Sequence, residues 1–172
     1  MIGFSYEKWL KKLILKLKFY HKKDVGKFLS ERLALLVQLH PVLNRALEEG
    51  RLVVTFLPAH WYRHYFQKGY NQSQLLAKLL ADQLACSCLA LAKKTRATAS
   101  QLSLKREKRL KNLTGVFESL EALEALPKGA VLVLVDDVTT TGASLNELAT
   151  TLKNKRPDLQ YWGLVIARHM GG

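Results

Sequence analysis

The segment 131–144 constrains the fold of this 172-residue chain more than any other, and its sequence is V-L-V-L-V-D-D-V-T-T-T-G-A-S. The five apolar residues at 131–135 are typical of a strand that is buried on both faces. An amphipathic helix follows at once, with Leu145, Leu148 and Leu152 on one face. A buried strand that leads directly into a helix is the repeating unit of a parallel sheet covered by helices.

Other segments repeat this alternation. Residues 52–57 form a second short apolar run that stops at Pro58, and Asn71 is a suitable N-cap for a helix over 72–84. Shorter strands are predicted at the following ranges: 88–92, 114–117 and 161–167. We therefore expect a doubly wound parallel α/β sheet, flanked by helices, over residues 51–172.

The N-terminal residues 1–50 predict helices that pack on this core or form a hood over it. Residues 5–20 have apolar positions at helical spacing and lysines over most of the remaining surface, and a second helix is predicted over 25–39. Three roles stay open for the basic helix. It can cover the sheet, follow a nucleic-acid backbone, or lie on an anionic membrane surface.

The net charge of +13 is unevenly placed. Residues 1–23 carry seven lysines and one glutamate, and residues 93–111 carry eight basic residues and one glutamate. A local excess of this kind implies an anionic partner such as a phosphate, a nucleic acid or a membrane surface. Lysines interrupt the apolar stretch near the N-terminus, so we expect neither a signal peptide nor a membrane span. Cys86 and Cys88 are too few for a structural zinc site and are expected to be packed thiols.

The carboxyl end of the strand at 131–135 carries the residues best suited to chemistry. Asp136 and Asp137 come at this end, where ligands bind in open α/β sheets. Hydroxyl residues and Gly142 then lead into a helix, and N–H groups at a helix N-terminus bind phosphate monoesters. Carboxylates next to a phosphate site are explained if they accept hydrogen bonds from sugar hydroxyls. A ribose 5-phosphate fits this pattern.

This segment resembles the motif with which type I phosphoribosyltransferases bind 5-phosphoribosyl 1-pyrophosphate (PRPP), which is an apolar strand, two acids and T-T-G-x-[ST]. Further motifs narrow the resemblance to the ComF (GntX-like) family. They are K-G-Y-N-Q-x-x-L-L-A at 68–77, R-x-T-x-x-Q-x-x-L at 96–104 and R-x-x-N-L-x-G-x-F at 109–117. The likeness covers nearly the whole chain in the same order, and it implies a type I phosphoribosyltransferase-like fold.

The resemblance implies roles for individual residues. Asp136 and Asp137 would be catalytic and would hold the ribose hydroxyls, directly or through Mg²⁺ and water. The 5-phosphate would be held by the turn after the strand, at Thr139, Thr140, Thr141, Gly142, Ala143 and Ser144. The pyrophosphate would be held by the loop after the first strand, at Ala59, His60, Arg63 and Lys68. The flexible catalytic loop of the superfamily corresponds to residues 93–111, where the candidates for stabilising the departing pyrophosphate are Lys105, Arg106 and Arg109.

Alternatives stay open at several of these positions. Asp136 and Asp137 are also good helix-capping residues, and Ser144 can serve as a cap as well. His60 can be an ordinary surface histidine, and residues 93–111 can be a solvated basic loop. Thr140 stands where purine-salvage relatives have an aspartate, and a threonine is not a general base near neutral pH. The acceptor is then of the pyrimidine kind or needs no proton transfer, or PRPP is bound without turnover.

The resemblance implies a protein that binds PRPP with Mg²⁺ and handles incoming single-stranded DNA during natural transformation. The candidates for DNA binding are Lys11, Lys12, Lys16, Lys105 and Lys108. The setting implied is the cytoplasm or the inner-membrane surface, with a competence helicase or membrane channel as partner. The alternative is an active pentosyltransferase of nucleotide or base salvage with no direct DNA role, whose acceptor the sequence does not identify.

Two departures from the family pattern bear on these expectations. Family members usually begin with a four-cysteine zinc ribbon, which is absent from this sequence, so no zinc is expected in the chain. The stretch after Pro58 usually contains more arginine than it does here, where only Arg63 and Lys68 carry a permanent charge. This departure weakens the expected grip on pyrophosphate.

Overall fold

The computed structural model describes residues 1–5, 9–10, 12–15, 23–59, 71–96 and 114–168. Its elements are β1 (Ile2–Ser5), α2 (Lys23–Leu39), α3 (Pro41–Glu48), β2 (Leu52–Phe56), α5 (Gln72–Leu84), β3 (Ser87–Cys88), β4 (Ala92–Lys94), β5 (Phe117–Ser119), η2 (Glu121–Leu123), β6 (Val131–Thr139), α7 (Ala143–Lys155) and β7 (Gln160–Arg168). No helix in these ranges is long and apolar enough to cross a membrane.

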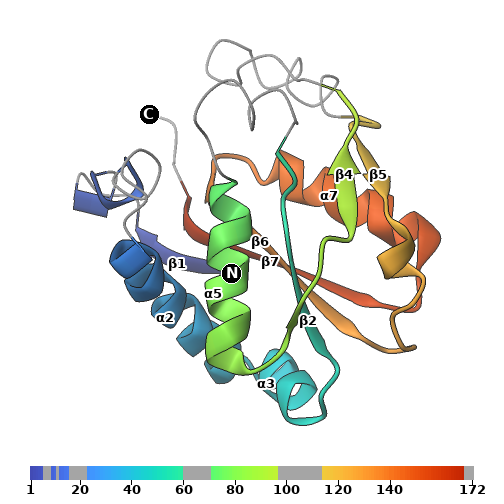
Figure 1. Cartoon of the computed structure of the whole chain (residues 1–172), viewed down its shortest axis with the longest axis horizontal. Helices are drawn as coiled ribbons and strands as arrows, with labels where there is room; N and C mark the ends of the chain where they lie inside the picture. Colours follow the sequence, from blue (N-terminus) through green and yellow to red (C-terminus); the bar gives the residue numbers. More distant parts are fainter. Residues whose placement is uncertain (6–8, 11, 16–22, 60–70, 97–113, 169–172) are drawn as a thin grey trace.

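Five strands form one parallel sheet in the order β1-β7-β6-β2-β3 (Figure 1). β6 lies at its centre, where Val131 is level with Leu52 of β2 and with Gln160 of β7. Parallel strands bring their carboxyl ends to the same edge of the sheet. The predicted parallel α/β architecture is thereby confirmed, and the acids that end the apolar run of β6 lie at this edge.

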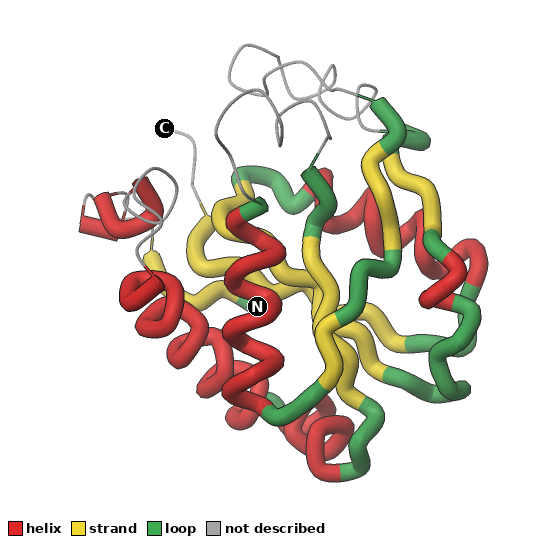
Figure 2. Tube along the Cα trace, viewed as in Figure 1, coloured by secondary structure: helices red, strands yellow, loops and turns green. Residues whose placement is uncertain are grey.

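Helices cover both faces of the sheet (Figure 2). On one face Val131, Val133 and Val135 of β6 pack in a cluster with apolar residues of α2, α3 and α5. On the other face Leu132 and Leu134 pack with residues of α7, β4, β5 and η2. Alternate residues of β6 therefore enter two cores, which explains why its apolar run is continuous rather than alternating.

The N-terminal residues contain a strand that the sequence analysis does not predict. β1 pairs in parallel with β7, with Ile2 level with Val165, and Ser5 belongs to this strand rather than to the helix predicted from residue 5. Gly3 permits the close approach, because a Cβ there would lie 3.1 Å from the carbonyl oxygen of Ile166. Residues 9–10 and 12–15 are helical as expected, whereas the rest of that helix lies outside the described residues.

Two of the predicted short strands need correction. Residues 88–92 do not form one strand, because β3 joins the main sheet beside β2 and Ala92 begins β4 of a separate two-stranded sheet. β4 pairs in antiparallel fashion with β5, which begins at Phe117, three residues after the predicted start. Lys93 and Lys94 therefore belong to a strand, not to the predicted loop. Leu91 is 1% exposed between the two strands, and its burial draws the chain out of the main sheet.

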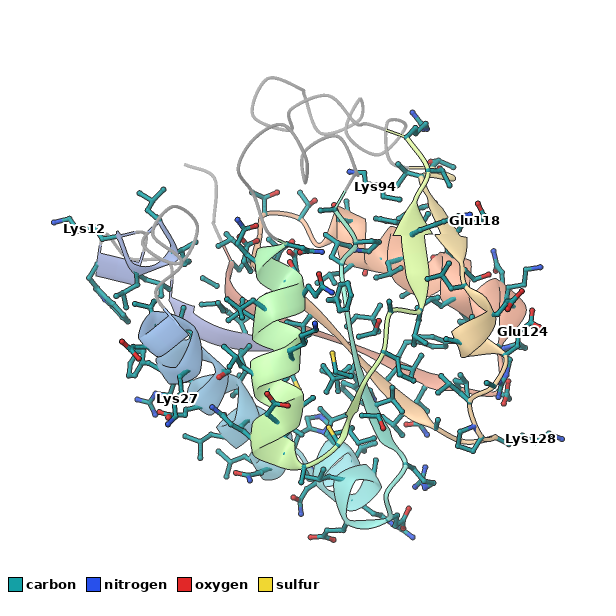
Figure 3. All side chains as sticks on the ribbon, viewed as in Figure 1. Lys12, Lys27, Lys94, Glu118, Glu124 and Lys128 are labelled. Carbon is teal, nitrogen blue, oxygen red and sulfur yellow. The ribbon has the colours of Figure 1, made fainter. Side chains whose placement is uncertain are left out.

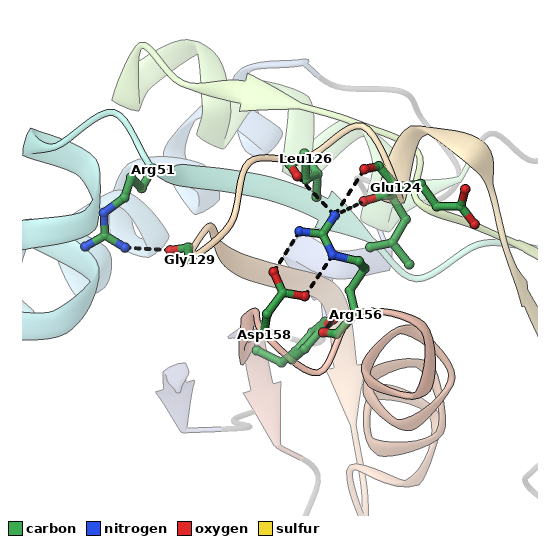
Figure 4. Close-up of polar contacts among 8 residues, drawn as sticks. Arg51, Glu124, Leu126, Gly129, Arg156 and Asp158 are labelled. Atoms are coloured by element: carbon green, nitrogen blue, oxygen red, sulfur yellow. Dashed lines mark hydrogen bonds and ion pairs between the residues drawn. The ribbon is translucent and has the colours of Figure 1, made fainter.

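Two arginines hold the connections that lead into the central strands (Figure 4). Arg156, after α7, donates hydrogen bonds to the carbonyl oxygens of Leu123, Glu124 and Leu126 and forms an ion pair with Asp158. Arg51, just before β2, donates to the carbonyl oxygen of Gly129, just before β6. The amino ends of β2, β6 and β7 are therefore joined by side chain to backbone contacts as well as by the sheet.

Candidate functional site

The carboxylates of Asp136 and Asp137 lie where β6 reaches the carboxyl edge of the sheet. Asp136 is 8% exposed, and its Oδ1 accepts hydrogen bonds of 2.9 Å from the Ser73 hydroxyl and from the Asp137 N–H. Asp137 is partly exposed, and its Oδ1 accepts a bond of 2.7 Å from the Val138 N–H. Asp136 is thus anchored inside the protein, and Asp137 is the more accessible of the two carboxylates.

Burial raises the pKa of Asp136 well above its usual range, and the neighbouring charge of Asp137 raises it further. The hydrogen bond from Ser73 acts in the opposite direction, since it stabilises the ionised form. Two adjacent carboxylates, one of them buried, are an arrangement that a cation or a pair of hydroxyl donors would stabilise.

The turn between β6 and α7 folds into a cradle of backbone N–H groups. Gly142 caps α7 with a φ of 77°, a left-handed conformation that glycine adopts without strain. Its N–H donates to Thr139 Oγ1 at 2.8 Å, and the Ala143 N–H donates to Thr141 Oγ1 at 3.3 Å. The two hydroxyls occupy the N–H groups that a phosphate oxygen would use. A bound phosphate would displace them, and each hydroxyl could then donate to it.

The requirement for glycine at position 142 comes from the backbone and not from crowding by the protein. A Cβ at Gly142 would meet no protein atom within 4 Å, so the space beside it is open. The positive φ disfavours any other residue, and a side chain would occupy room that a ligand needs.

Arg168, the last residue of β7, braces this cradle from outside. Its Nε donates a hydrogen bond of 3.2 Å to the carbonyl oxygen of Thr140. Because the C=O and N–H of a trans peptide point in opposite directions, this bond turns the Thr141 N–H away from Arg168. The sequence analysis assigns no role to Arg168. The available signal is the parallel pairing of the last two strands, which brings Arg168 level with Thr139.

The N-terminus of α5 lies at the same edge of the sheet. Asn71 caps this helix as predicted, since its Oδ1 accepts from the Gln74 N–H, and its Nδ2 also donates to the carbonyl oxygen of Leu57. The Leu57 N–H in turn donates to the carbonyl oxygen of Val135. The end of β2, the end of β6 and the start of α5 are therefore tied together.

The β4–β5 hairpin holds both ends of the basic segment 97–113. Thr95 N–H donates to the Val116 carbonyl oxygen, and Arg96 Nη2 donates to that of Thr114. The Gly115 N–H donates a bond of 2.7 Å to Glu147 Oε1 on α7. The helix that begins at the cradle therefore also anchors the base of this hairpin.

The structure brings some of the predicted site residues together. Asp136, Asp137 and the turn 139–144 are contiguous at the end of β6, and Ala59 lies two residues after Leu57, which is bonded to Val135. Lys12 is exposed near α2, far along the chain from Lys94 on the hairpin (Figure 3). The remaining predicted residues lie outside the described ranges: Lys11, Lys16, His60, Arg63, Lys68, Lys105, Arg106, Lys108 and Arg109.

Comparisons with known proteins agree with this geometry. The family model described as "Phosphoribosyl transferase domain" matches residues 71–167. The "DNA utilization protein YhgH" of Escherichia coli (strain K12) is 37% identical over 162 residues, which cover 93% of this chain and 68% of that protein. The "Competence protein F" of Haemophilus influenzae is 34% identical over 113 residues, 64% of this chain and 48% of that protein. The chain belongs to the ComF family of the phosphoribosyltransferase superfamily.

A solved structure, the crystal structure of TT1426 from Thermus thermophilus, covers 86% of this ComF-family chain and 84% of its own chain, at 15% identity and a TM-score of 0.36. A likeness at this level carries no information about function.

The carboxylate pair fits the Mg²⁺ that the ComF resemblance implies, because Mg²⁺ prefers oxygen ligands and is bound through one or two carboxylates together with substrate phosphates. Within the described ranges no group of three or more His, Cys, Asp or Glu side chains could hold a metal by itself. Asp136 and Asp137 would therefore hold Mg²⁺ jointly with a phosphorylated ligand, directly or through water.

Proposed function

We propose that this ComF-family protein binds PRPP with Mg²⁺ at the carboxyl edge of its sheet. The observation that carries the proposal is the continuity of the carboxylate pair with the glycine-capped cradle. Both lie in one segment of β6 and α7, inside the region that matches the phosphoribosyl transferase domain. A ribose 5-phosphate bridges such a pair of sites, because its hydroxyls and its phosphate lie at opposite ends of one small ring.

Each part of the site has a distinct task in this proposal. The N–H groups and hydroxyls of residues 139–144 hold the 5-phosphate, and the N-terminus of α7 favours its charge. Asp137, the more accessible carboxylate, and Asp136 accept hydrogen bonds from the ribose hydroxyls. Bound Mg²⁺ neutralises charge on the pyrophosphate.

Calorimetric titration with PRPP, with and without Mg²⁺, tests this proposal. The wild-type protein should bind PRPP in a Mg²⁺-dependent manner, and the double variant Asp136→Asn, Asp137→Asn should remain folded and lose this binding. Unchanged affinity in the folded double variant would reject the assignment.

We also propose that the protein takes part in handling single-stranded DNA. The names of its relatives, "DNA utilization protein" and "Competence protein F", support this role, as does the local excess of positive charge at residues 1–23 and 93–111. A cytoplasmic setting, contact with the inner membrane and a competence helicase or channel as partner remain part of this proposal.

A second candidate is catalytic transfer of the phosphoribosyl group. The hairpin that holds the basic segment 97–113 and is anchored to α7 by Glu147 favours it. In this reaction the bond between C1 of the ribose and the pyrophosphate oxygen breaks, a bond from C1 to the acceptor forms, and pyrophosphate leaves. Lys105, Arg106 and Arg109 would stabilise the leaving group.

Isotope exchange between pyrophosphate and PRPP over a panel of bases separates the two candidates. Exchange that requires one class of base would establish the transferase. Mg²⁺-dependent binding without exchange or pyrophosphate release would leave PRPP as a bound ligand only.

A further inference from the structure

We infer that Ser73 is a positioning residue for the carboxylate pair, an inference that rests on the proposed function. Its hydroxyl reaches from the first turn of α5 to the end of β6 and donates a hydrogen bond of 2.9 Å to Asp136 Oδ1. Ser73 is 6% exposed and Asp136 is 8% exposed, so water hardly competes with this bond. The two residues are 63 positions apart in the chain, and no local sequence pattern connects them.

The bond determines which oxygen of Asp136 can serve a ligand. Oδ1 accepts two hydrogen bonds, from Ser73 and from the Asp137 N–H. Two donors on one oxygen fix the plane of the carboxylate, and Oδ2 is the atom left to accept from a ribose hydroxyl or a water bound to Mg²⁺. Because Asp137 is the next residue, the same bond fixes the spacing of the two carboxylates.

The start of α5 delivers Ser73 to this place. Asn71 pins the helix N-terminus, because its side chain bonds both to the helix at Gln74 and to the end of β2 at Leu57. Ser73 lies two residues later in the same turn and points into the interior. A rigid helix start therefore sets the position of the hydroxyl, rather than a loop.

Only a small side chain with a hydroxyl group serves this role. Alanine fits the space but removes a donor from a buried carboxylate, which is costly because the lost bond is to a charged group. Threonine keeps the hydroxyl group and adds one methyl group. The pair Ser73→Ala and Ser73→Thr therefore separates the loss of the hydrogen bond from a change in packing.

The experiment titrates ribose 5-phosphate and PRPP, each with Mg²⁺, into wild type, Ser73→Ala, Ser73→Thr, Asp136→Asn and the double variant. We expect Ser73→Ala to weaken binding roughly tenfold or more, and Ser73→Thr to restore most of the affinity. In the Asp136→Asn background the serine substitution should cause no further loss. Ser30→Ala is the matched control, because Ser30 is a fully buried serine in α2 that bonds to Lys27 and Gln83, away from the carboxylates.

Two outcomes would overturn the inference while the proposed function stands. One is wild-type affinity in a folded Ser73→Ala variant, and the other is an equal loss of affinity in Ser73→Ala and Ser30→Ala. If the wild-type protein bound neither ligand, the proposed function would fail and the role of Ser73 with it. Thermal unfolding of each variant shows whether a loss of affinity reflects a loss of folded protein.

Discussion

At the scale of single residues, the raised pKa of Asp136 links the site to the stability of the fold. Burial and the charge of Asp137 make the folded protein hold a proton at Asp136 more tightly than the unfolded chain does. The free energy of unfolding must then decrease as the pH rises from about 3.9, the ordinary value for aspartate, to the raised pKa of the folded state. The protein keeps a buried charge in its site at the expense of stability at neutral pH.

Asp136→Asn should therefore stabilise the protein while it abolishes ligand binding. Asparagine keeps an acceptor for Ser73 and removes the buried charge, so we expect a gain of roughly 0.5–2 kcal/mol at pH 7. The gain should shrink as the pH falls toward 4, where the aspartate of the wild type is protonated. Urea unfolding at several pH values measures it. A variant less stable than wild type at pH 7 would contradict this account of the burial.

Gly142→Ala tests the cradle. The φ of 77° should cost an alanine about 1 kcal/mol of folding free energy, and affinity for ribose 5-phosphate should fall by at least tenfold. Gly129→Ala is a matched control, because Gly129 has a φ of 73° and equally open surroundings at the opposite end of β6. Both variants should lose similar stability in urea. Equal affinity in the two would argue against phosphate binding at Gly142.

Arg168→Ala should weaken ribose 5-phosphate binding through the cradle rather than through the carboxylates. Without Arg168 the peptide between Thr140 and Thr141 is free to rotate, so the N–H of Thr141 is less often directed into the cradle. We expect a loss of a few-fold that Arg168→Lys only partly restores, because lysine lacks the planar fork of donors. Titration of inorganic phosphate isolates this effect, and a loss for PRPP but not for phosphate would point to another role.

At the scale of elements, the sequence predicts best those with a strong local signal. The helix 72–84 is predictable together with its cap, because Asn71 and the apolar periodicity act within one turn. β6 is recognisable from its apolar run, although it continues through Thr139, past the acids, since pairing with β7 extends it. β1 escapes prediction because four residues have too little pattern, and only the distant partner β7 makes them a strand.

The candidate site divides in the same way. The turn 139–144 and the acids are predictable because they are contiguous in sequence. Ser73 and Arg168 are not, because their roles arise from contacts across the sheet edge.

The hairpin of β4 and β5 gives a prediction at this scale. Glu147→Ala removes the acceptor of the Gly115 N–H and so loosens the base of the hairpin from α7. We expect a loss of stability of about 1 kcal/mol and weaker binding of PRPP, with the affinity for ribose 5-phosphate unchanged. Parallel titrations of the two ligands measure this difference. An equal loss for both would place the effect at the cradle instead.

At the scale of the whole molecule, the uneven charge gives a test of DNA binding. Binding to single strands should weaken steeply with salt, by roughly 0.7 logarithmic units per neutralised phosphate and tenfold change in salt. Replacing Lys11, Lys12 and Lys16 with glutamine should weaken DNA binding, reduce the salt slope and leave PRPP affinity intact. Fluorescence anisotropy with a labelled oligonucleotide measures both.

The matched control replaces Lys128, Lys153 and Lys155, which removes the same charge from outside the two basic segments. If both triple variants lost affinity equally, net charge rather than a DNA-binding surface would explain the result. No saturable binding at low salt would remove the DNA role of this chain.

The pairing of β1 with β7 joins segments from opposite ends of the described residues, and the central β6 begins only at Val131. During synthesis on the ribosome, Leu52 must wait for Val131 before β2 gains a neighbour on that side, and Ile2 must wait for Val165. A topology with such distant contacts folds slowly and leaves apolar strands exposed in the meantime. The sheet is therefore completed only after β7 has left the exit tunnel, and the nascent segments before β6 depend on their own helices, or on a chaperone, until then.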